Sequence, residues 1–564
     1  MFLHQVFFLY HWKRRRLYEL AAKIPGPPTT PILGNVFDGG SFVPRDLQKF
    51  LFKTFKEHNN LFRMWIGPKL YIFLKNSSEV EQVFINNPDA FAKSHDYDFL
   101  NSLAGQGIFC QDDEEIWHRN RKIVNKLFHY SVLKHYVHTF HEETISLVDK
   151  LKQIIVNKPS DIAIHSMLAV LTFNTIAKNT MGVHIESNLS NRTLKAVEKF
   201  FSLFWDVAVR PWLENELLFK AFGYKDLKIS IENFARNVVR EIIDMAKTKK
   251  LHEDSNNNGM PNRKITMIDL QKDGFSEEQL LFWDVAVRPW LENELLFKAF
   301  GYKDLKISIE NFARNVVREI IDMAKTKKLH EDSNNNGMPN RKITMIDLQK
   351  DGFSEEQLMQ ETITLIVSGQ DTSASANSAA LFLLSMDQKV QQEIFEELHS
   401  IFGDDKERCP TYEELQNMPV LDRCIKEVLR MYPPGYIIAR RIRREIKIGD
   451  YDIPKDATIM NYIYAMHRDP NVYENPDQFN PDRFLPEKFG KYPKYNYQPF
   501  AAGNRKCIAY KYAMLQMKIV ISTVLRHFKI LPSPRYKTID DLKYEMRVTL
   551  TFYNGIYVSL ESRY

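Results

Sequence analysis

The stretch PFAAGNRKCIAYKYAMLQMK places a cysteine, Cys507, where a sharp turn at Gly503 leads into a helix with an apolar face. A thiolate at that point lies at the positive end of the helix dipole and near free backbone N–H groups, which favours its ionised, metal-binding form. Phe500 could shield the sulfur from water, and Arg505 could pair with an anionic group of a cofactor. Considered alone, Cys507 reads by default as a buried, inert thiol beside a helix start.

A long apolar segment, MQETITLIVSGQDTSASANSAALFLLSM, predicts a buried helix that carries a second reactive group. Asp371 and Thr372 interrupt it with an acid and a hydroxyl, and Gly369 beside them permits the close approach of a ligand. An acid and a hydroxyl at one point of a helix could transfer protons. Thr372 could equally donate its hydrogen bond to a carbonyl one turn earlier in the helix.

Charged residues in three further stretches could bind an anion or form ion pairs. Trp117 and Arg121 lie four apart in EEIWHRNRK, and Arg440 ends PPGYIIAR. Glu427 and Arg430 lie three apart in LDRCIKEVLRMYPP, on one face of a predicted helix. Considered by itself, each of these cations is more often a solvated surface group. A pair spaced like Glu427 and Arg430 adds little to the stability of a protein when it lies at the surface.

Taken together, these stretches resemble the motifs of the cytochrome P450 superfamily. The cysteine loop matches the pattern FxxGxRxCxG at Phe500, Gly503, Arg505 and Cys507, with Ala509 where the family usually has glycine. The other matches are the WxxxR pattern at Trp117 and Arg121, the [AG]Gx[DE]T[TS] pattern around Asp371 and Thr372, and the ExxR pattern at Glu427 and Arg430 followed by Arg483 in FNPDRF. The resemblance runs from the proline-rich segment near the amino terminus to the carboxyl terminus.

The resemblance implies a haem-thiolate monooxygenase that binds one haem b. By that likeness Cys507 is the axial thiolate ligand, and Thr372 and Asp371 assist dioxygen and deliver protons. Propionate contacts would come from Trp117, Arg121 and Arg440. The Glu427, Arg430 and Arg483 cluster would stabilise the core beneath the haem. Electrons would come from NADPH through a separate flavoprotein reductase, and cytochrome b5 is a second donor that the resemblance suggests.

Two stretches, GIFCQDDEEIWHRNRK and HRDPNVYENPDQFNPDRF, are similar to the family-four clan and have an insect-like character. That clan is best known for hydroxylating fatty acids and related lipids, so the resemblance implies an apolar substrate such as a fatty acid, a terpenoid or a xenobiotic. Many of its members link a glutamate of the long helix to haem through an ester. Ser368 stands at that place here, and Glu361 lies about 10 Å earlier along the axis. We therefore expect haem without a covalent link.

The elements that must position these residues read as a mainly α fold with a minor β part. Most of the chain after Leu358 has helical patterning, with short strands near the carboxyl end, where Asn554-Gly555 in LTFYNGIYVSL predicts a hairpin. A net charge of +6 over 564 residues, without a basic tract, argues against nucleic-acid binding. Four cysteines without a CxxC pair argue against a structural zinc site.

Three regions are expected along the chain. Residues 1–24 read as a short membrane anchor with the basic flank Lys13 to Arg16, although the apolar part is shorter than the roughly 20 residues a span needs. An amphipathic start without a membrane role is the alternative. Residues 25–35 form a proline-rich hinge, and 36–564 form the monooxygenase domain. With the resemblance, this predicts the cytosolic face of the endoplasmic reticulum membrane.

An internal repeat interrupts the domain, because residues 203–280 recur without a change as residues 281–358. Structural repeats are typically about 20–50 residues long and drift in sequence, so this pair indicates a recent exon duplication or an assembly error. Two other functions remain open. One is a haem-thiolate isomerase or dehydratase that needs no reductase, against which Asp371 and Thr372 argue. The other is an inactive haem-binding protein, which Ala509, the short anchor and the duplication favour.

Overall fold

The computed structural model describes residues 10–210 and 345–563, apart from 31–32, 39–43, 59–60, 99, 102–104, 158–160, scattered positions between 183 and 209, and 349–351. Most of the duplicated segment and the apolar start of the anchor therefore lie outside the described residues. The prediction that the fold is mainly α with a minor β part is confirmed.

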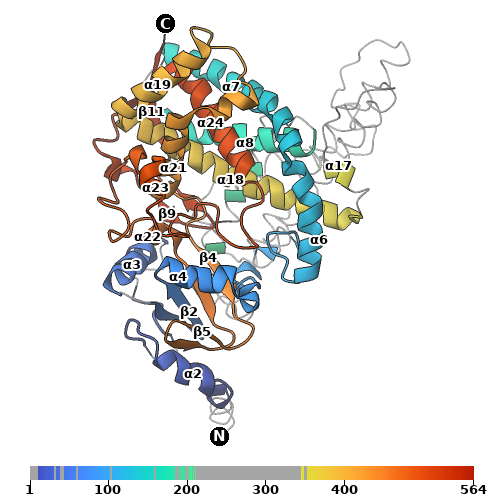
Figure 1. Ribbon diagram of the computed structural model, residues 1–564, viewed down its shortest axis with the longest axis vertical. Helices are drawn as coiled ribbons and strands as arrows, with labels where there is room; N and C mark the ends of the chain where they lie inside the picture. The colour runs from blue at the N-terminus through green and yellow to red at the C-terminus, as the bar shows by residue number, and fades with distance from the viewer. Residues whose placement is uncertain are drawn as a thin grey trace, which may run out of the picture.

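Helices form the larger part of the molecule and surround one central helix. The central helix is α18 (Glu355–Met386), and its helical neighbours include α8 (Ile164–Thr180), α19 (Gln388–Phe402), α21 (Pro419–Met431) and α24 (Tyr510–His527) (Figure 1). Helix α7 (Tyr130–Asn157) packs against α8 and α24. Ser354 caps α18, because its side chain accepts a hydrogen bond from the Gln357 N–H and Gln357 bonds back in a capping box. Beyond Thr372 the helix is almost fully buried, which explains why this part of its sequence carries no charged residue. Its polar side chains Asn377, Ser378 and Ser385 donate hydrogen bonds to carbonyls of the helix itself.

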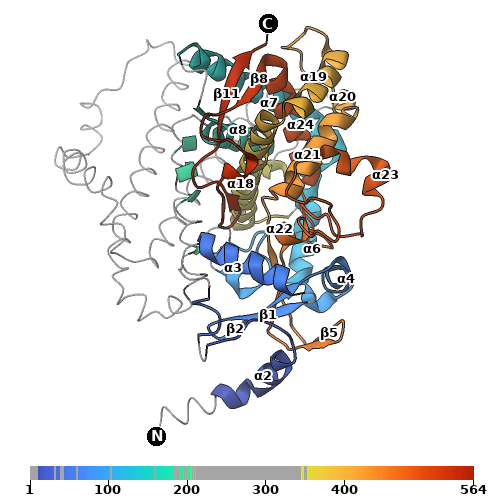
Figure 2. The same ribbon diagram turned by 90° about the vertical axis from the view of Figure 1, so that its left-hand side faces the viewer.

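A smaller part near the amino terminus is built on a four-stranded sheet with the order β1-β2-β7-β4. Its strands are β1 (Phe62–Ile66), β2 (Lys69–Leu74), β7 (Thr458–Asn461) and β4 (Ile438–Arg441). Strands β2 and β7 run parallel, so the sheet joins an early part of the chain to a late one. Helix α3 (Pro44–Glu57) lies beside this sheet, and α2 (Arg15–Ala22) lies at its far end (Figure 2).

Several short elements complete the fold. They are α4 (Ser77–Val80), α6 (Glu114–Val124), α17 (Met345–Leu348), α20 (Tyr412–Gln416), α22 (Ile463–Met466), α23 (Pro486–Phe489), β5 (Ile446–Ile448), β6 (Tyr451–Ile453), β9 (Glu545–Met546) and β10 (Leu550–Thr551). A three-stranded sheet joins β3 (Ile162–Ala163), β11 (Tyr557–Ser562) and β8 (Phe528–Pro532).

The hairpin predicted at Asn554-Gly555 is wrong, although the turn exists. Gly555 has a φ of 71° and donates its N–H to the Phe552 carbonyl at 3.0 Å, as a turn requires. The strands on its two sides belong to different sheets, because β10 pairs with β9 and β11 pairs with β3 and β8. A turn motif therefore marked the reversal of the chain but did not determine the strand partners.

The proline-rich hinge and the basic flank pack against the sheet. The Pro25 carbonyl accepts the Arg63 N–H at 2.7 Å, and Gly26 lies so close to strand β1 that a Cβ there would be 2.3 Å from the Arg63 carbonyl oxygen. Arg16 of the flank forms an ion pair with Glu445 at 2.8 Å. Among the described residues, no helix combines the length and the apolar character needed to cross a bilayer.

Candidate active site

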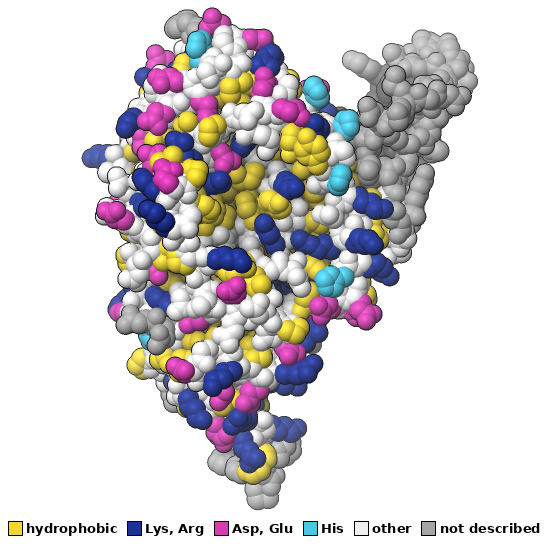
Figure 3. Space-filling view, in the orientation of Figure 1, with side chains coloured by type: hydrophobic (Ala, Val, Ile, Leu, Met, Phe, Trp, Pro, Cys, Tyr) yellow, Lys and Arg dark blue, Asp and Glu magenta, His cyan; other side chains and the backbone are white. Residues whose placement is uncertain are grey.

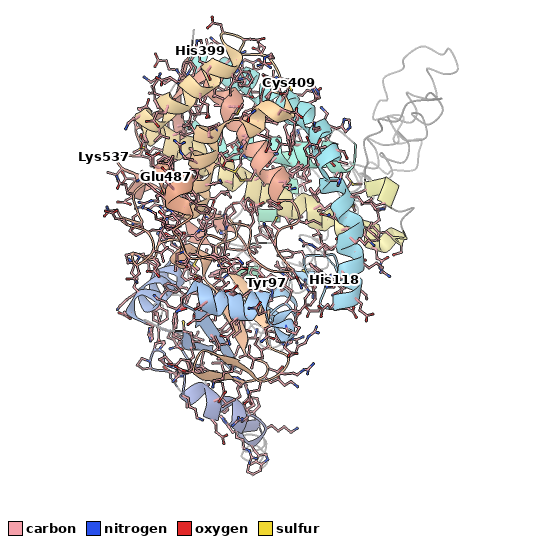
Figure 4. The ribbon with its side chains drawn as sticks, in the orientation of Figure 1. Tyr97, His118, His399, Cys409, Glu487 and Lys537 are labelled. Atoms are coloured by element: carbon pink, nitrogen blue, oxygen red, sulfur yellow. The ribbon has the colours of Figure 1, made fainter. Side chains whose placement is uncertain are left out.

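A cavity of about 440 Å³ lies between α18, the sheet strand β4 and the cysteine loop, and its walls are mostly apolar. It brings together all but one of the residues predicted to act at a cofactor or substrate. These are Trp117, Arg121, Asp371, Thr372, Arg440, Phe500, Arg505 and Cys507. Tyr97, labelled in Figure 4, also lines the cavity, and its ring packs edge-on against Phe109.

Gly503 is the predicted residue that does not line the cavity, and its role is to shape the cysteine loop. Its φ is 74°, and a Cβ at this position would lie 2.1 Å from the carbonyl oxygen of Phe84. The loop then closes on itself, because Lys506 donates its N–H to the Gly503 carbonyl at 3.0 Å and Cys507 donates to the Phe500 carbonyl at 2.9 Å. Only glycine fits this backbone conformation and this approach.

Cys507 faces the cavity, just before α24 begins at Tyr510. Burial by the surrounding protein raises the pKa of its thiol, while the Ala509 N–H and the positive charge of Arg121 act in the opposite direction. The predicted stabilisation by N–H groups at a helix start is therefore present, but burial outweighs it. The residue is nevertheless exposed where it borders the cavity, and a metal cation beside the sulfur is the kind of partner that makes such a desolvated thiol ionise.

Three cations gather at one side of the cavity: Lys93 and Arg440 are buried, and Arg505 is partly buried. Arg440 and Arg505 lie near each other, and Lys93 lies close to both, joined to Arg440 by a backbone β-bridge. Burial and the neighbouring Arg440 lower the pKa of Arg505 to about 9, and burial with these two arginines lowers the pKa of Lys93, while the carboxylate of Asp112 opposes both shifts. Among the described residues, the buried Nε and Nη1 atoms of Arg505 have no hydrogen-bond partner.

Lys93 was missed by the sequence analysis, and no sequence signal marks it. It lies in an ordinary loop, with its ammonium over the rings of Tyr97 and Phe109, at 4.5 and 4.6 Å from their centroids. Its neighbours in space come from distant parts of the chain, so no local motif contains it.

Trp117 and Arg121 lie on α6, one turn apart, and both already contact backbone. The helix is capped by Asp113, which accepts the Ile116 N–H at 2.9 Å. Trp117 donates its Nε1–H to the Ile108 carbonyl at 3.0 Å, and Arg121 donates from Nη2 to the Lys506 carbonyl at 2.5 Å. The Arg121 bond joins α6 to the residue that precedes Cys507, and the Trp117 bond joins α6 to Ile108. A propionate contact for either side chain stays a prediction.

Asp371 and Thr372 both line the cavity from the middle of α18. The Thr372 hydroxyl donates to the Ser368 carbonyl at 2.7 Å, which is the helix-internal bond considered as the alternative from the sequence. Asp371 accepts a hydrogen bond from the Thr549 hydroxyl. Burial raises the pKa of Asp371 to about 6, so this acid can exchange a proton near neutral pH.

Comparison with known proteins decides the family. The family model described as Cytochrome P450 matches residues 24–281 and 288–552. The chain belongs to the cytochrome P450 family. It is 29% identical to Cytochrome P450 4c3 of Drosophila melanogaster, over 93% of this chain and 86% of the relative, and 27% identical to Cytochrome P450 4g15 of the same organism, over 99% and 95%. Cytochrome P450 4V2 of Pongo abelii is 26% identical, over 90% and 83%.

The predicted superfamily, its family-four character and the monooxygenase class are thereby confirmed. Cytochromes P450 bind haem b through an axial thiolate and use electrons derived from NADPH. The geometry of this chain fits that group. Asp112 is one anion beside three mutually repelling cations, and two N–H groups of Arg505 still lack an acceptor, so carboxylates such as haem propionates fit this side of the cavity. The cavity also presents a cysteine and apolar walls to a flat, largely apolar ring.

In this P450 the predicted cluster of Glu427, Arg430 and Arg483 is present and buried. Arg430 donates from Nε and Nη2 to the two carboxylate oxygens of Glu427 at 2.7 and 2.9 Å. Arg483 donates from Nε to the same carboxylate at 3.3 Å. Arg430 also donates from Nη1 to the His467 carbonyl at 2.8 Å. The cluster therefore fixes α21 to the segment that leads into the cysteine loop.

Proposed function

We propose that Cys507 supplies the thiolate ligand of haem b and that the cavity above it admits a lipid-like substrate such as a fatty acid, a terpenoid or an apolar xenobiotic. The observation that carries this proposal is the single cavity that joins Cys507, a group of buried cations and extensive apolar walls. The reaction inserts one atom of dioxygen into the substrate and reduces the other to water. Haem supplies the oxygen chemistry, which a thiolate ligand favours by donating electron density.

Each predicted site residue has a role that its position supports. Arg440 and Arg505 bind propionates, because both are cations that line the cavity and are partly or wholly withdrawn from solvent. Trp117 and Arg121 complete that contact from α6. Phe500 lies against the cysteine loop and shields the sulfur from water.

Asp371 and Thr372 move protons on the substrate side of the cavity. The pKa of Asp371, raised to about 6 by burial, lies close enough to neutral pH for the carboxyl to release and regain a proton during turnover. For Thr372, the bond to Ser368 uses the hydroxyl hydrogen and leaves its oxygen as an acceptor. When the hydroxyl hydrogen rotates away from the Ser368 carbonyl, Thr372 can donate it to a different acceptor in the cavity.

Electrons from NADPH reach the site through a separate reductase, and cytochrome b5 is a second donor. The docking surface that we propose consists of the exposed cations Arg119, Lys122, Lys126 and Lys511 near the haem-binding motifs. Figure 3 shows basic side chains gathered across the middle of this face of the molecule. Such a surface steers an acidic partner, so reversing two of these charges should raise the apparent KM for reductase, most strongly at low salt.

We also propose that the enzyme lies on the cytosolic face of the endoplasmic reticulum membrane. The support is the aromatic and basic composition of the amino-terminal segment, in which Tyr10 and Trp12 are exposed next to Arg14 and Arg15. Amphipathic aromatic rings beside cations favour the interface between lipid and water.

The deciding experiment compares the reduced carbon-monoxide complexes of two cysteine variants. Cys507→Ala should lose the thiolate-type absorption band and all turnover with reductase, NADPH and a lipid panel. Cys409→Ala should keep both, because Cys409 lies at the far end of the helical part from Tyr97 (Figure 4). A thiolate-type band in Cys507→Ala would contradict the ligand assignment. A band without reductase-dependent turnover would favour an isomerase or an inactive haem protein.

A further inference from the structure

Glu361 is a fully buried carboxylate on α18, two turns before Ser368, and it does not line the cavity. Its two oxygens each accept the Ile108 N–H at 3.0 Å, and Oε1 also accepts from Asn120 Nδ2 at 3.3 Å. Burying a carboxylate is costly unless donors compensate, and these donors are neutral N–H groups from a loop and from α6. Burial raises the pKa of Glu361 to about 7, and the bonds from Ile108 and Asn120 oppose that rise, so a carboxyl near its own ionisation point holds one backbone amide.

Ile108 belongs to the loop of residues 105–111. This loop is held against α18 along one turn of the helix. Gln106 donates its N–H to Gln360 Oε1 at 3.0 Å, next to the contact of Glu361. A Cβ on Gly107 would lie 2.3 Å from the Thr364 hydroxyl oxygen. The loop thus approaches the helix as closely as a glycine allows, and Glu361 stands at the centre of the contact.

The 105–111 loop makes two kinds of contact at the active site. Ile108 and Phe109 place their side chains in the cavity wall. The Ile108 carbonyl accepts the Nε1–H of Trp117, whose ring lies 5.0 Å from the guanidinium of Arg505. The N–H of Ile108 therefore bonds to Glu361, and its carbonyl bonds to Trp117, one of the residues proposed to contact a propionate.

We propose that Glu361 is a positioning residue that fixes the 105–111 loop as one wall of the cavity and thereby sets which ligands fit above the haem. The proposal rests on the proposed function, because it takes the cavity as the place where substrate binds. Glu361 acts through Ile108 and touches neither cofactor nor substrate.

The test uses Glu361→Gln and Gly107→Ala, which disturb the contact from its two sides, with Glu397→Gln as the matched control. Glu397 on α19 also accepts two backbone N–H groups, from Val420 at 2.7 Å and Leu421 at 3.0 Å, away from the cavity. One readout is hydrogen–deuterium exchange of a peptide that spans residues 105–111. The other is the ratio of the dissociation constants of imidazole and 4-phenylimidazole, small and bulky ligands of haem iron.

Both disturbing variants should raise exchange in the 105–111 peptide and change the imidazole to 4-phenylimidazole ratio by about tenfold, the effect of leaving one buried donor poorly paired. Their double variant should show less than the product of the two effects, because both act on one contact. Glu397→Gln should change neither readout. Exchange and ratio equal to those of the control in both variants would overturn the proposal. If the parent protein lacks the thiolate-type band, the proposed function fails, and the exchange readout still decides whether Glu361 holds the loop.

Discussion

The carboxylate of Asp371 accepts a hydrogen bond from the hydroxyl of Thr549, which lies 178 positions later in the chain. Thr549 follows β9 and lines the same cavity as Asp371. Burial raises the pKa of Asp371, and the Thr549 bond opposes that rise. The protonation of the proposed proton donor therefore depends on a residue of the cavity wall, so a substrate that displaces this wall also changes the acid.

Thr549→Val should raise the pKa of Asp371 further, because a hydrogen bond to the charged form is lost. Loss of one such bond corresponds to about one pH unit. The fraction of NADPH oxidation that is coupled to product should depend on pH, and the midpoint of that dependence should rise by the same amount. Peroxide formed per NADPH consumed, followed against pH, measures it.

Thr551→Val is the matched control on the same turn, since the Thr551 hydroxyl bonds to the Thr549 carbonyl and not to Asp371. An identical pH profile for Thr549→Val and the parent enzyme would contradict the role of this bond.

Asp371→Asn should stabilise the fold above about pH 6. The folded-state pKa of about 6 exceeds the ordinary value near 4, so the folded protein binds the proton more tightly than the unfolded chain does. The contribution of Asp371 to the free energy of unfolding of the parent protein is therefore complete below about pH 4, and it is lost as the pH rises through about 6. Asparagine keeps an acceptor for Thr549 and does not titrate. At neutral pH the free energy of unfolding of Asp371→Asn should exceed that of the parent protein by about 2 kcal/mol. Thermal unfolding at several pH values measures this difference.

A gain in stability that is equal at low and neutral pH would contradict this account, because it could not come from the ionisation of Asp371. Haem occupancy is matched between the two proteins before each measurement.

Contacts between residues close in sequence were predictable from the residues themselves, whereas a contact across the chain, such as that of Arg483 with Glu427, was predictable only through the family resemblance. Glu427 and Arg430 lie three apart on one helix, so their spacing already placed them on one face. The cysteine loop was predictable because its turn, aromatic and arginine lie within eight residues. Lys93 pairs with Arg440, 347 positions later, and Thr549 bonds to Asp371, 178 positions earlier, and no periodicity encodes such pairs.

Arg430→Lys should lower the yield of folded holoenzyme sharply. The ion pair with Glu427 is fully buried and two-pronged, and lysine keeps the charge but cannot make both bonds. A buried carboxylate that loses its partner typically costs about 3–5 kcal/mol, and the lysine variant should approach the lower end. Chemical unfolding of the purified protein, with haem absorbance as a second signal, measures the change.

The control is Arg408→Lys, because Arg408 makes a similar two-pronged contact with Glu414 at 3.0 Å in a partly exposed setting. Solvent screens that pair, so its variant should lose at most about 1 kcal/mol. Equal losses in the two variants would show that burial does not set the importance of the Glu427 cluster.

Haem should be held without a covalent link. In many family-four enzymes the ester uses a glutamate at the position of Ser368, and here a serine faces the cavity there. Glu361 is committed to Ile108 and Asn120 and does not line the cavity, so it cannot take that place. Acidified organic solvent should extract all haem from the parent protein after turnover. Ser368→Glu, which restores a carboxylate at this point of α18, is the positive control and should retain a fraction of its haem. Retention of haem by the parent polypeptide would mean that a residue other than Ser368 makes the link.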